Sequence, residues 1–457
     1  MRRALRTAIP VLLSLAAFRP AAAQDAQYWT QQYGNQARLL GGNVVGGTAD
    51  VSATYYNPGR LALIDTPELL LAGNVFEYTT VTIEGAVLDQ RFTSNRFGSV
   101  PSLFAGQIRS LSRGDSRVAY SLLTRYSSQF RFDERRDINR FLPVPLDLAT
   151  FSYSLDEAMS EYWGGLTWAR KLGDRVGIGV TGYVAVRNHR SRLLVLTQAM
   201  ENGRAGVAID RYDFDYYHWG ALAKIGLGAD LGSWLLGVTV TTPNLKILGQ
   251  GAIGLDASVV TQDLNGDDIQ ASRIISGYRD KLSSHYDAPA SLAIGVSHRW
   301  DRTTWHVSAE WFAGVPAYTV LEGGTATDVD GTTVRDMKLI DERDAVLNFG
   351  VGLEHRFRED LLGYASFRTD FSSAERAGRG RATSSIWDMY HLTTGATFSA
   401  LSSKFTLGLM YAFGSDELLT PEAVVPDDDG SGAAIAPARL KVSFRRLTGL
   451  LGFSFGF

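Results

Sequence analysis

Apolar and polar residues alternate along several stretches of the chain, and residues 404–413 show the pattern most fully. One set of alternate positions there is apolar and aromatic: Phe405, Leu407, Leu409, Tyr411 and Phe413. The other set is smaller or more polar: Thr406, Gly408, Met410 and Ala412. A half-buried strand of a soluble protein also alternates, but a small, polar second face is typical of the interior of a transmembrane barrel. The pattern therefore predicts a strand with its apolar face against lipid.

The same parity recurs in residues 290–297, 305–311 and 345–358. Fourteen candidate strands follow from it, at about 67–84, 99–111, 116–132, 157–172, 174–199, 206–230, 233–249, 285–300, 303–319, 343–358, 361–374, 386–399, 403–414 and 440–457. Bacterial single-chain barrels have an even number of antiparallel strands. We therefore expect an all-β fold, a 14-stranded antiparallel transmembrane β-barrel.

The predicted connections alternate in length. Short turns such as 112–115 and 230–233 alternate with long loops such as 133–156, 250–284 and 320–342. Outer-membrane barrels have short periplasmic turns and longer extracellular loops. The alternation therefore places the start of the first strand and the end of the last strand on the periplasmic side of the outer membrane.

The last strand ends in an aromatic residue. Leu451, Phe453, Phe455 and Phe457 share one register, and an alternating strand with a terminal aromatic residue is similar to the signal that the barrel-assembly machinery reads. We therefore expect that machinery as a partner, and outer-membrane lipid and lipopolysaccharide as the surroundings.

The N-terminus has the order of a secretory signal. Arg2, Arg3 and Arg6 precede an apolar run at 9–18, and small residues follow at 21–23. This order predicts a signal peptide at 1–23. The alternative, an inner-membrane anchor, is disfavoured because the apolar run is too short to span a bilayer. Export of the chain fits a location in the bacterial cell outer membrane.

Residues 24–65 precede the first predicted strand and do not alternate. Between residues 36 and 47, Leu39, Leu40, Val44 and Val45 are mixed with four glycines. Irregular backbone at membrane depth is tolerated only inside protein or in a wet cavity. We therefore expect residues 24–65 to form a hatch in the lumen of a barrel built from residues 66–457.

The segment resembles the N-terminal hatch of the FadL family of outer-membrane transporters. The residues that carry the resemblance are Ala49, Asp50, Tyr55, Tyr56, Asn57, Pro58 and Gly59. Gly59 departs from the family, which usually has Ala at this position. The resemblance implies passive uptake of hydrophobic molecules, long-chain fatty acids or hydrocarbons, which leave through a gap beside a kinked strand. The third predicted strand, 116–132, has no Gly or Pro, so its sequence does not predict a kink.

Three arginines are candidates to contact a ligand in the lumen. By parity Arg125, Arg356 and Arg368 face inward, and a fatty acid carboxylate in a lumen of low dielectric constant needs a cationic or hydrogen-bonding partner. The alternative role is structural, since Glu354 and Asp370 could pair with them.

Composition narrows the remaining classes of function. The formal net charge is −3, so no basic field invites nucleic acid, and the absence of cysteine excludes disulfides and thiol nucleophiles. The seven histidines lie outside any G-x-S-x-G or H-E-x-x-H motif, so we expect no enzyme, no cofactor and no metal. The acidic stretches 263–268, 328–331 and 427–430 could bind calcium, but they fit solvated loops better than an EF-hand.

Two other roles on the same fold remain open. The chain could resemble FadL-like barrels that act in protein secretion, or be a structural outer-membrane protein. A general porin is disfavoured because a plugged lumen would not conduct freely.

Overall fold

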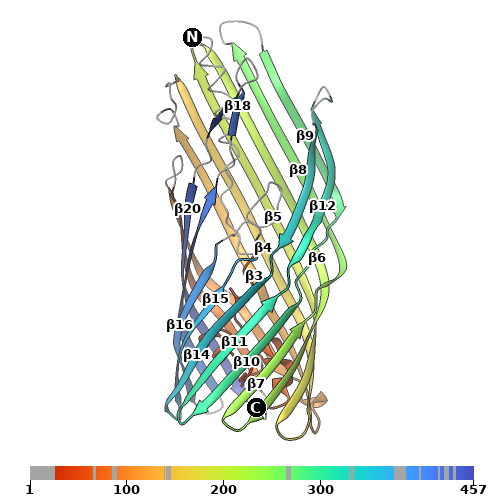
Figure 1. Cartoon of the computed structure of the whole chain (residues 1–457), viewed down its shortest axis with the longest axis vertical. Helices are drawn as coiled ribbons and strands as arrows, with labels where there is room; N and C mark the ends of the chain where they lie inside the picture. Colours follow the sequence, from red (N-terminus) through yellow and green to blue (C-terminus); the bar gives the residue numbers. More distant parts are fainter. Residues whose placement is uncertain are drawn as a thin grey trace.

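The strands form one closed, largely antiparallel sheet that stands as a tall barrel (Figure 1). This computed structural model describes residues 26–64, 68–84, 90–137, 139, 146–263, 269–328, 331, 334–374, 387–400, 403–419, 423–426, 432–435 and 439–456. Eighteen described strands make up the sheet. Eight of these are the halves of four wall strands, so the wall is fourteen strands round, as predicted.

Ten wall strands run unbroken. They are β1 (Glu68–Glu84), β2 (Gln90–Gln107), β3 (Ser116–Asp137), β4 (Leu148–Lys171), β5 (Val176–Glu201), β6 (Arg204–Leu231), β15 (Leu361–Asp370), β16 (Met389–Ala400), β17 (Ser403–Leu419) and β20 (Arg439–Gly456). Pairing of β1 with β20 closes the barrel. A short 3-10 turn, η1 (Arg109–Leu111), follows β2, and β18 (Ala423–Pro426) pairs with β19 (Gly432–Ile435) in a separate small sheet.

Four neighbouring wall strands are each broken into a lower and an upper half. The halves are β7 (Trp234–Thr241) and β8 (Leu245–Asp263), β10 (Ser291–Trp300) and β9 (Ile269–Ser283), β11 (Thr303–Phe312) and β12 (Val315–Asp328), and β14 (Val346–Arg358) and β13 (Val334–Arg343). The breaks at 242–244, 284–290, 313–314 and 344–345 together form what we call the crease. The prediction of continuous strands across these positions was wrong. Pro243 and Pro289 contribute to the breaks because proline cannot donate to a strand ladder.

Much of the predicted loop sequence is strand. β8 and β9 occupy most of 250–284, and β12 and β13 occupy most of 320–342. Burial still alternates along β4 above the lipid-facing region, so the wall continues as a sheet beyond the apolar band. Many outward-facing residues there are polar, such as Ser276 and Asp280 on β9, which concealed the strands from a search for lipid-facing alternation.

The outer surface confirms the predicted parity. Phe405, Leu407 and Leu409 are about half exposed, whereas Thr406 and Ala412 are buried. Lipid-facing bands of barrels end in aromatic residues.

On β4 this band runs from Trp168 to Tyr162, both exposed, and the next outward residues toward the upper end are Ser160, Ala158 and Asp156. Among the described residues, no helix is long and apolar enough to cross a membrane.

The interior holds two large apolar clusters. The lower cluster joins residues of the N-terminal segment, such as Leu39 and Leu61, to inward residues of the wall. The upper cluster packs Ile253 of β8 and Ile275 of β9 against Met337 of β13. The β12–β13 hairpin therefore lies against the inner face of the sheet above the crease.

Candidate functional site: the plugged lumen

Residues 26–64, which we call the lumenal segment, lie inside the lower part of the barrel (Figure 1). Only Ala49 among them is exposed. The segment contains three short helices, α2 (Asn35–Leu39), α3 (Ala53–Tyr56) and α4 (Pro58–Leu61). These are the described residues of the predicted hatch at 24–65, and both the hatch and its role as a gate stay predictions. The predicted signal peptide at 1–23 lies outside the described residues.

The Asn-Pro-Gly part of the predicted hatch motif caps a helix and attaches it to the wall. Asn57 is extended, as expected before a proline, and its side-chain oxygen accepts the Gly59 N–H at 3.0 Å. The Asn57 Nδ2 donates to the carbonyls of Val45 and Leu227, both at 2.9 Å. One side chain therefore links two parts of the lumenal segment to β6.

Gly59 has a steric reason to differ from the alanine usual in the FadL family. A Cβ at this position would lie 2.5 Å from the carbonyl oxygen of Gly177 and 2.6 Å from that of Gly226. Both contacts are to wall backbone, which has little freedom to withdraw. The departure from the family pattern thus follows from the close approach of α4 to β5 and β6.

Wall glycines seat the lumenal segment around the barrel. A Cβ at any of them would come within about 3 Å of an atom of the lumenal segment, at Gly177, Gly179, Gly226, Gly228, Gly237, Gly295, Gly350, Gly352, Gly395, Gly408 and Gly452. These residues belong to eight wall strands. The segment therefore fits against backbone on most sides, and any rotation of it would meet the wall.

Two buried charged groups of the lumenal segment are held by hydrogen bonds, Arg38 to the wall and Asp50 within the segment. Arg38 donates to the carbonyls of Gly73 at 2.9 Å and Leu451 at 3.2 Å. Asp50 accepts the Ser52 N–H at 2.8 Å. Burial lowers the pKa of Arg38 to about 10 and raises the pKa of Asp50 above its usual range.

The structure separates the three predicted ligand arginines. Arg368 is fully buried and donates to the carbonyls of Trp29 at 3.1 Å and Thr30 at 3.2 Å, so it anchors the lumenal segment. Arg356 shares its face with Glu354, which contacts Gln36 of the lumenal segment, but it is exposed near the short-turn end of β14, outside the enclosed lumen. Only Arg125 is buried at a place that faces aromatic side chains of the lumen.

Arg125 sits at a bulge in β3. The pairing of β3 with β4 shifts register between Thr124 and Tyr126, so the Arg125 guanidinium turns inward, 4.9 Å from the Tyr126 ring centre and 5.7 Å from that of Trp163. Its Nη1 has no hydrogen-bond partner among the described residues. A role of Arg125 in ligand contact stays a prediction.

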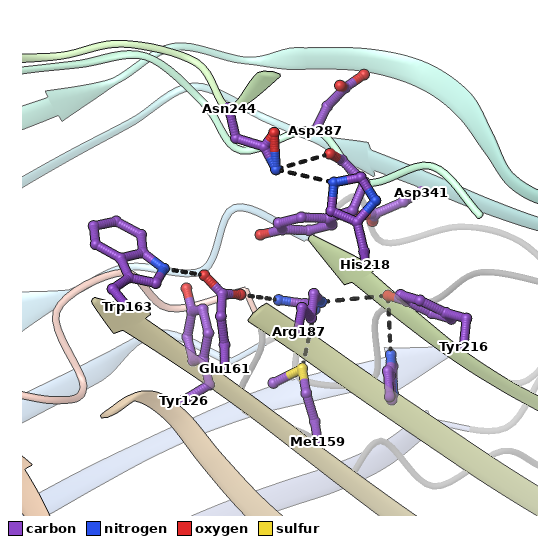
Figure 2. A network of polar contacts seen from close by, with 12 residues as sticks. Tyr126, Met159, Glu161, Trp163, Arg187, Tyr216, His218, Asn244, Asp287 and Asp341 are labelled. Carbon is purple, nitrogen blue, oxygen red and sulfur yellow. Dashed lines mark hydrogen bonds and ion pairs between the residues drawn. The ribbon is translucent and has the colours of Figure 1, made fainter. Parts of the chain in front are cut away.

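A network of buried polar groups lines the inner face of the neighbouring strands β4, β5 and β6 (Figure 2). Arg187 of β5 pairs with Glu161 of β4 at 2.8 Å, donates to the Tyr216 hydroxyl at 3.3 Å and approaches the Met159 Sδ at 3.0 Å. Both charged side chains are nearly inaccessible to solvent. Trp163 donates to the other Glu161 oxygen at 2.6 Å, so this carboxylate is satisfied within the wall.

Lys224 is another buried cation of the lumen. Its Nζ lies 4.3 Å from the ring centre of Tyr55 in the lumenal segment. Neither Lys224 nor Arg125 forms an ion pair with a described residue, whereas Arg187 has Glu161. Sequence reasoning did not select Arg187 or Lys224, although the parity rule that selected Arg125 also places them inward.

The wall has an open seam between β2 and β3. Within the described residues these strands pair only from Leu103–Leu123 to Gln107–Ala119, although β3 pairs with β4 almost along its whole length. Arg125 stands just above the last pair. The sequence did not predict this gap, because a bulge rather than a Gly or Pro disturbs β3.

The predicted calcium loops fall largely outside the described residues. Within the described part of the chain, no group of His, Asp or Glu side chains could hold a metal ion.

No protein-family model and no curated protein matches the chain, but solved structures do. The Pseudomonas putida toluene transporter TodX is 13% identical with a TM-score of 0.59, over 93% of this chain and 99% of TodX. A Pseudomonas aeruginosa FadL homologue is 13% identical with a TM-score of 0.56, over 96% and 100%.

The CymD monoaromatic hydrocarbon channel is 11% identical with a TM-score of 0.51, over 93% of this chain and 97% of CymD. Identities this low carry the fold alone. The likeness spans nearly the whole of each chain and agrees with the resemblance seen in residues 49–59. The chain therefore has the FadL-type barrel fold.

Proposed function

We propose that the chain is an outer-membrane channel for passive uptake of hydrophobic compounds, either long-chain fatty acids or hydrocarbons. The observation that carries the proposal is the seam between β2 and β3, directly above a lumenal segment that packs closely against the wall. A compound that enters the barrel from outside then has a side exit into lipid and no need to displace the lumenal segment.

The lower end of the seam is level with the apolar band of the wall. Phe104 and Leu122 are exposed beside it, whereas outward residues higher on β3, such as Arg131 and Asp133, are charged. A hydrophobic compound would therefore leave at the lower end, where it meets lipid.

Arg125 and Lys224 favour a ligand that carries a carboxylate. Buried cations are costly unless paired. Within the described residues these two face aromatic rings and form no close ion pair, although Glu161 lies within electrostatic reach of Arg125 and Glu310 within reach of Lys224. A fatty acid carboxylate could complete the site. A neutral hydrocarbon would use the rings of Tyr55 and Trp163 and leave the cations as they are.

Binding and uptake by the purified barrel test the proposal. We expect a fluorescent long-chain fatty acid to bind the protein in detergent and to enter proteoliposomes faster than empty liposomes. An Arg125→Gln variant should bind the acid about tenfold less tightly or weaker, as expected for loss of one charge-assisted hydrogen bond, and should bind a neutral hydrocarbon unchanged. Arg131→Gln, at an exposed position of the same strand, is the matched control.

Absence of both binding and uptake would reject the proposal. Large steady conductance in planar bilayers would instead indicate a porin, and co-purification of an exported protein would favour the secretion role.

A further inference from the structure

The crease brings a piece of wall backbone into the lumen. Residues 284–290 link β9 to β10 without forming a strand, and hydrogen bonds hold this segment in place. The Ser284 hydroxyl donates to the Tyr217 carbonyl at 2.6 Å, and the Asp287 N–H donates to the Tyr318 hydroxyl at 3.1 Å. The segment is therefore an ordered part of the interior and not a surface loop.

This segment places Tyr286 against Arg187. The Arg187 guanidinium lies 4.0 Å from the Tyr286 ring centre, and Tyr286 is 8% exposed. Asn244, at the neighbouring break, donates to the Tyr286 carbonyl at 3.1 Å, as Figure 2 shows beside His218. Two breaks of the crease thus cooperate to hold one aromatic ring over a buried cation.

The two partners differ in how firmly they are held. Arg187 is fixed on β5 by Glu161 and Tyr216. The Tyr286 ring is held by its contact with Arg187 and by the His218 ring, which meets it edge-on with 6.0 Å between ring centres. Rotation of the tyrosine therefore gives up these two ring contacts but leaves the Arg187–Glu161 pair in place.

The start of the lumenal segment occupies the rest of this layer. The Tyr126 hydroxyl, one residue from Arg125, donates to the Gln27 carbonyl at 3.3 Å. Tyr28 stacks on Phe312, the last residue of β11 before the crease, with ring centres 4.3 Å apart. A compound coming from the extracellular end therefore meets the layer of Tyr286, Arg187 and Tyr126 before it reaches Arg125 and the seam.

We infer that Tyr286 is the specificity-determining residue of a constriction above the lumenal segment, where its ring must leave Arg187 for a hydrophobic compound to pass. This inference rests on the proposed uptake of hydrophobic compounds for its ligand, but the closure itself does not. Narrow chains would pass with a small displacement of the ring, and bulky groups would need a larger one.

Substitution of Tyr286 tests this in two independent assays. Proteoliposome uptake compares a pyrene-labelled fatty acid with its unlabelled straight-chain parent, and planar bilayers report small-ion conductance. Tyr286→Ala should raise uptake of the pyrene acid relative to the parent by about two- to fivefold, the factor that one cation–π contact is worth, and should raise conductance. Tyr286→Phe keeps the ring and should match the wild type, as should Tyr278→Ala at an exposed tyrosine of β9.

Heat-modifiable migration on gels checks that each variant is folded, and Tyr286→Leu replaces the alanine variant if that one fails. Unchanged selectivity and conductance in the folded variant would overturn the constriction while leaving uptake by the wild type intact. Raised conductance without any uptake of either acid would support the constriction and reject the proposed function.

Discussion

Gly59 lies where the lumenal segment comes closest to the wall. Alanine is the usual residue of the FadL family at this position, but its Cβ would press on the carbonyl oxygens of Gly177 and Gly226. We expect Gly59→Ala to destabilise the barrel by about 1–3 kcal/mol, the usual cost of overpacking, as measured by urea unfolding in detergent. Gly182→Ala, on β5 with open space around it, is the control. Equal effects of the two substitutions would contradict close packing of the lumenal segment against the wall at Gly59.

Asp50 makes the stability of the lumenal segment depend on pH. Because burial raises its pKa, the folded state disfavours the ionised carboxylate and gains stability as the pH falls through that raised value. Asp50→Asn keeps an oxygen for the Ser52 N–H and does not titrate. We therefore expect the variant to melt at or above the wild-type temperature at pH 8, with the difference shrinking in acid.

Thermal melts across this pH range, with Asp174→Asn in an exposed turn as the control, check the expectation. A difference that grows toward low pH would show that the ionised form of Asp50 stabilises the fold instead.

At the scale of elements, the seam should be visible in hydrogen exchange. Successive amides of an antiparallel strand point to alternate neighbours, and β3 above Leu123 has a partner only on the β4 side. We expect about half of the amides in 127–137 to exchange fast. The amides of β5, which is paired on both sides along its length, should stay protected. Uniform protection of β3 would mean that β2 and β3 pair in solution.

The sequence predicted the wall better than its irregularities. Alternation reveals a lipid-facing strand because each outward side chain must be apolar, so all fourteen wall strands were found. The crease was missed because Pro243 and Pro289 are each compatible with a strand end. Arg356 keeps the parity of Glu354, but it lies at the short-turn end of β14, where it is exposed and not enclosed by the lumen. Arg187 and Tyr286 meet only through tertiary structure, since Arg187 lies on β5 and Tyr286 lies in the break between β9 and β10.

At the scale of the whole molecule, two features lead us to expect that the lumenal segment stays in place while compounds pass. They are its close packing against the wall glycines and the seam between β2 and β3. The native chain has no cysteine, so a single engineered pair can lock the lumenal segment to the wall. A Cβ at Gly47 would lie 3.0 Å from the Cβ of Ser297 on β10. Disulfides have a Cβ separation of about 3.5–4.5 Å, so the bond requires the two backbones to move apart slightly. We expect the Gly47→Cys, Ser297→Cys variant to take up the fluorescent fatty acid at the same rate, within about twofold, whether oxidised or reduced, because lateral exit needs no plug movement.

The wild type treated with the same oxidant and reductant controls for effects on the liposomes. Loss of uptake on oxidation, with recovery on reduction, would mean that the lumenal segment must move for each passage. The packing of the segment against the wall glycines would then describe only its resting state. The two outcomes separate the routes physically, since exit through the seam leaves all eleven glycine contacts intact while exit to the periplasm must break them. Persistence of uptake in the locked barrel would therefore assign the path to the wall between β2 and β3.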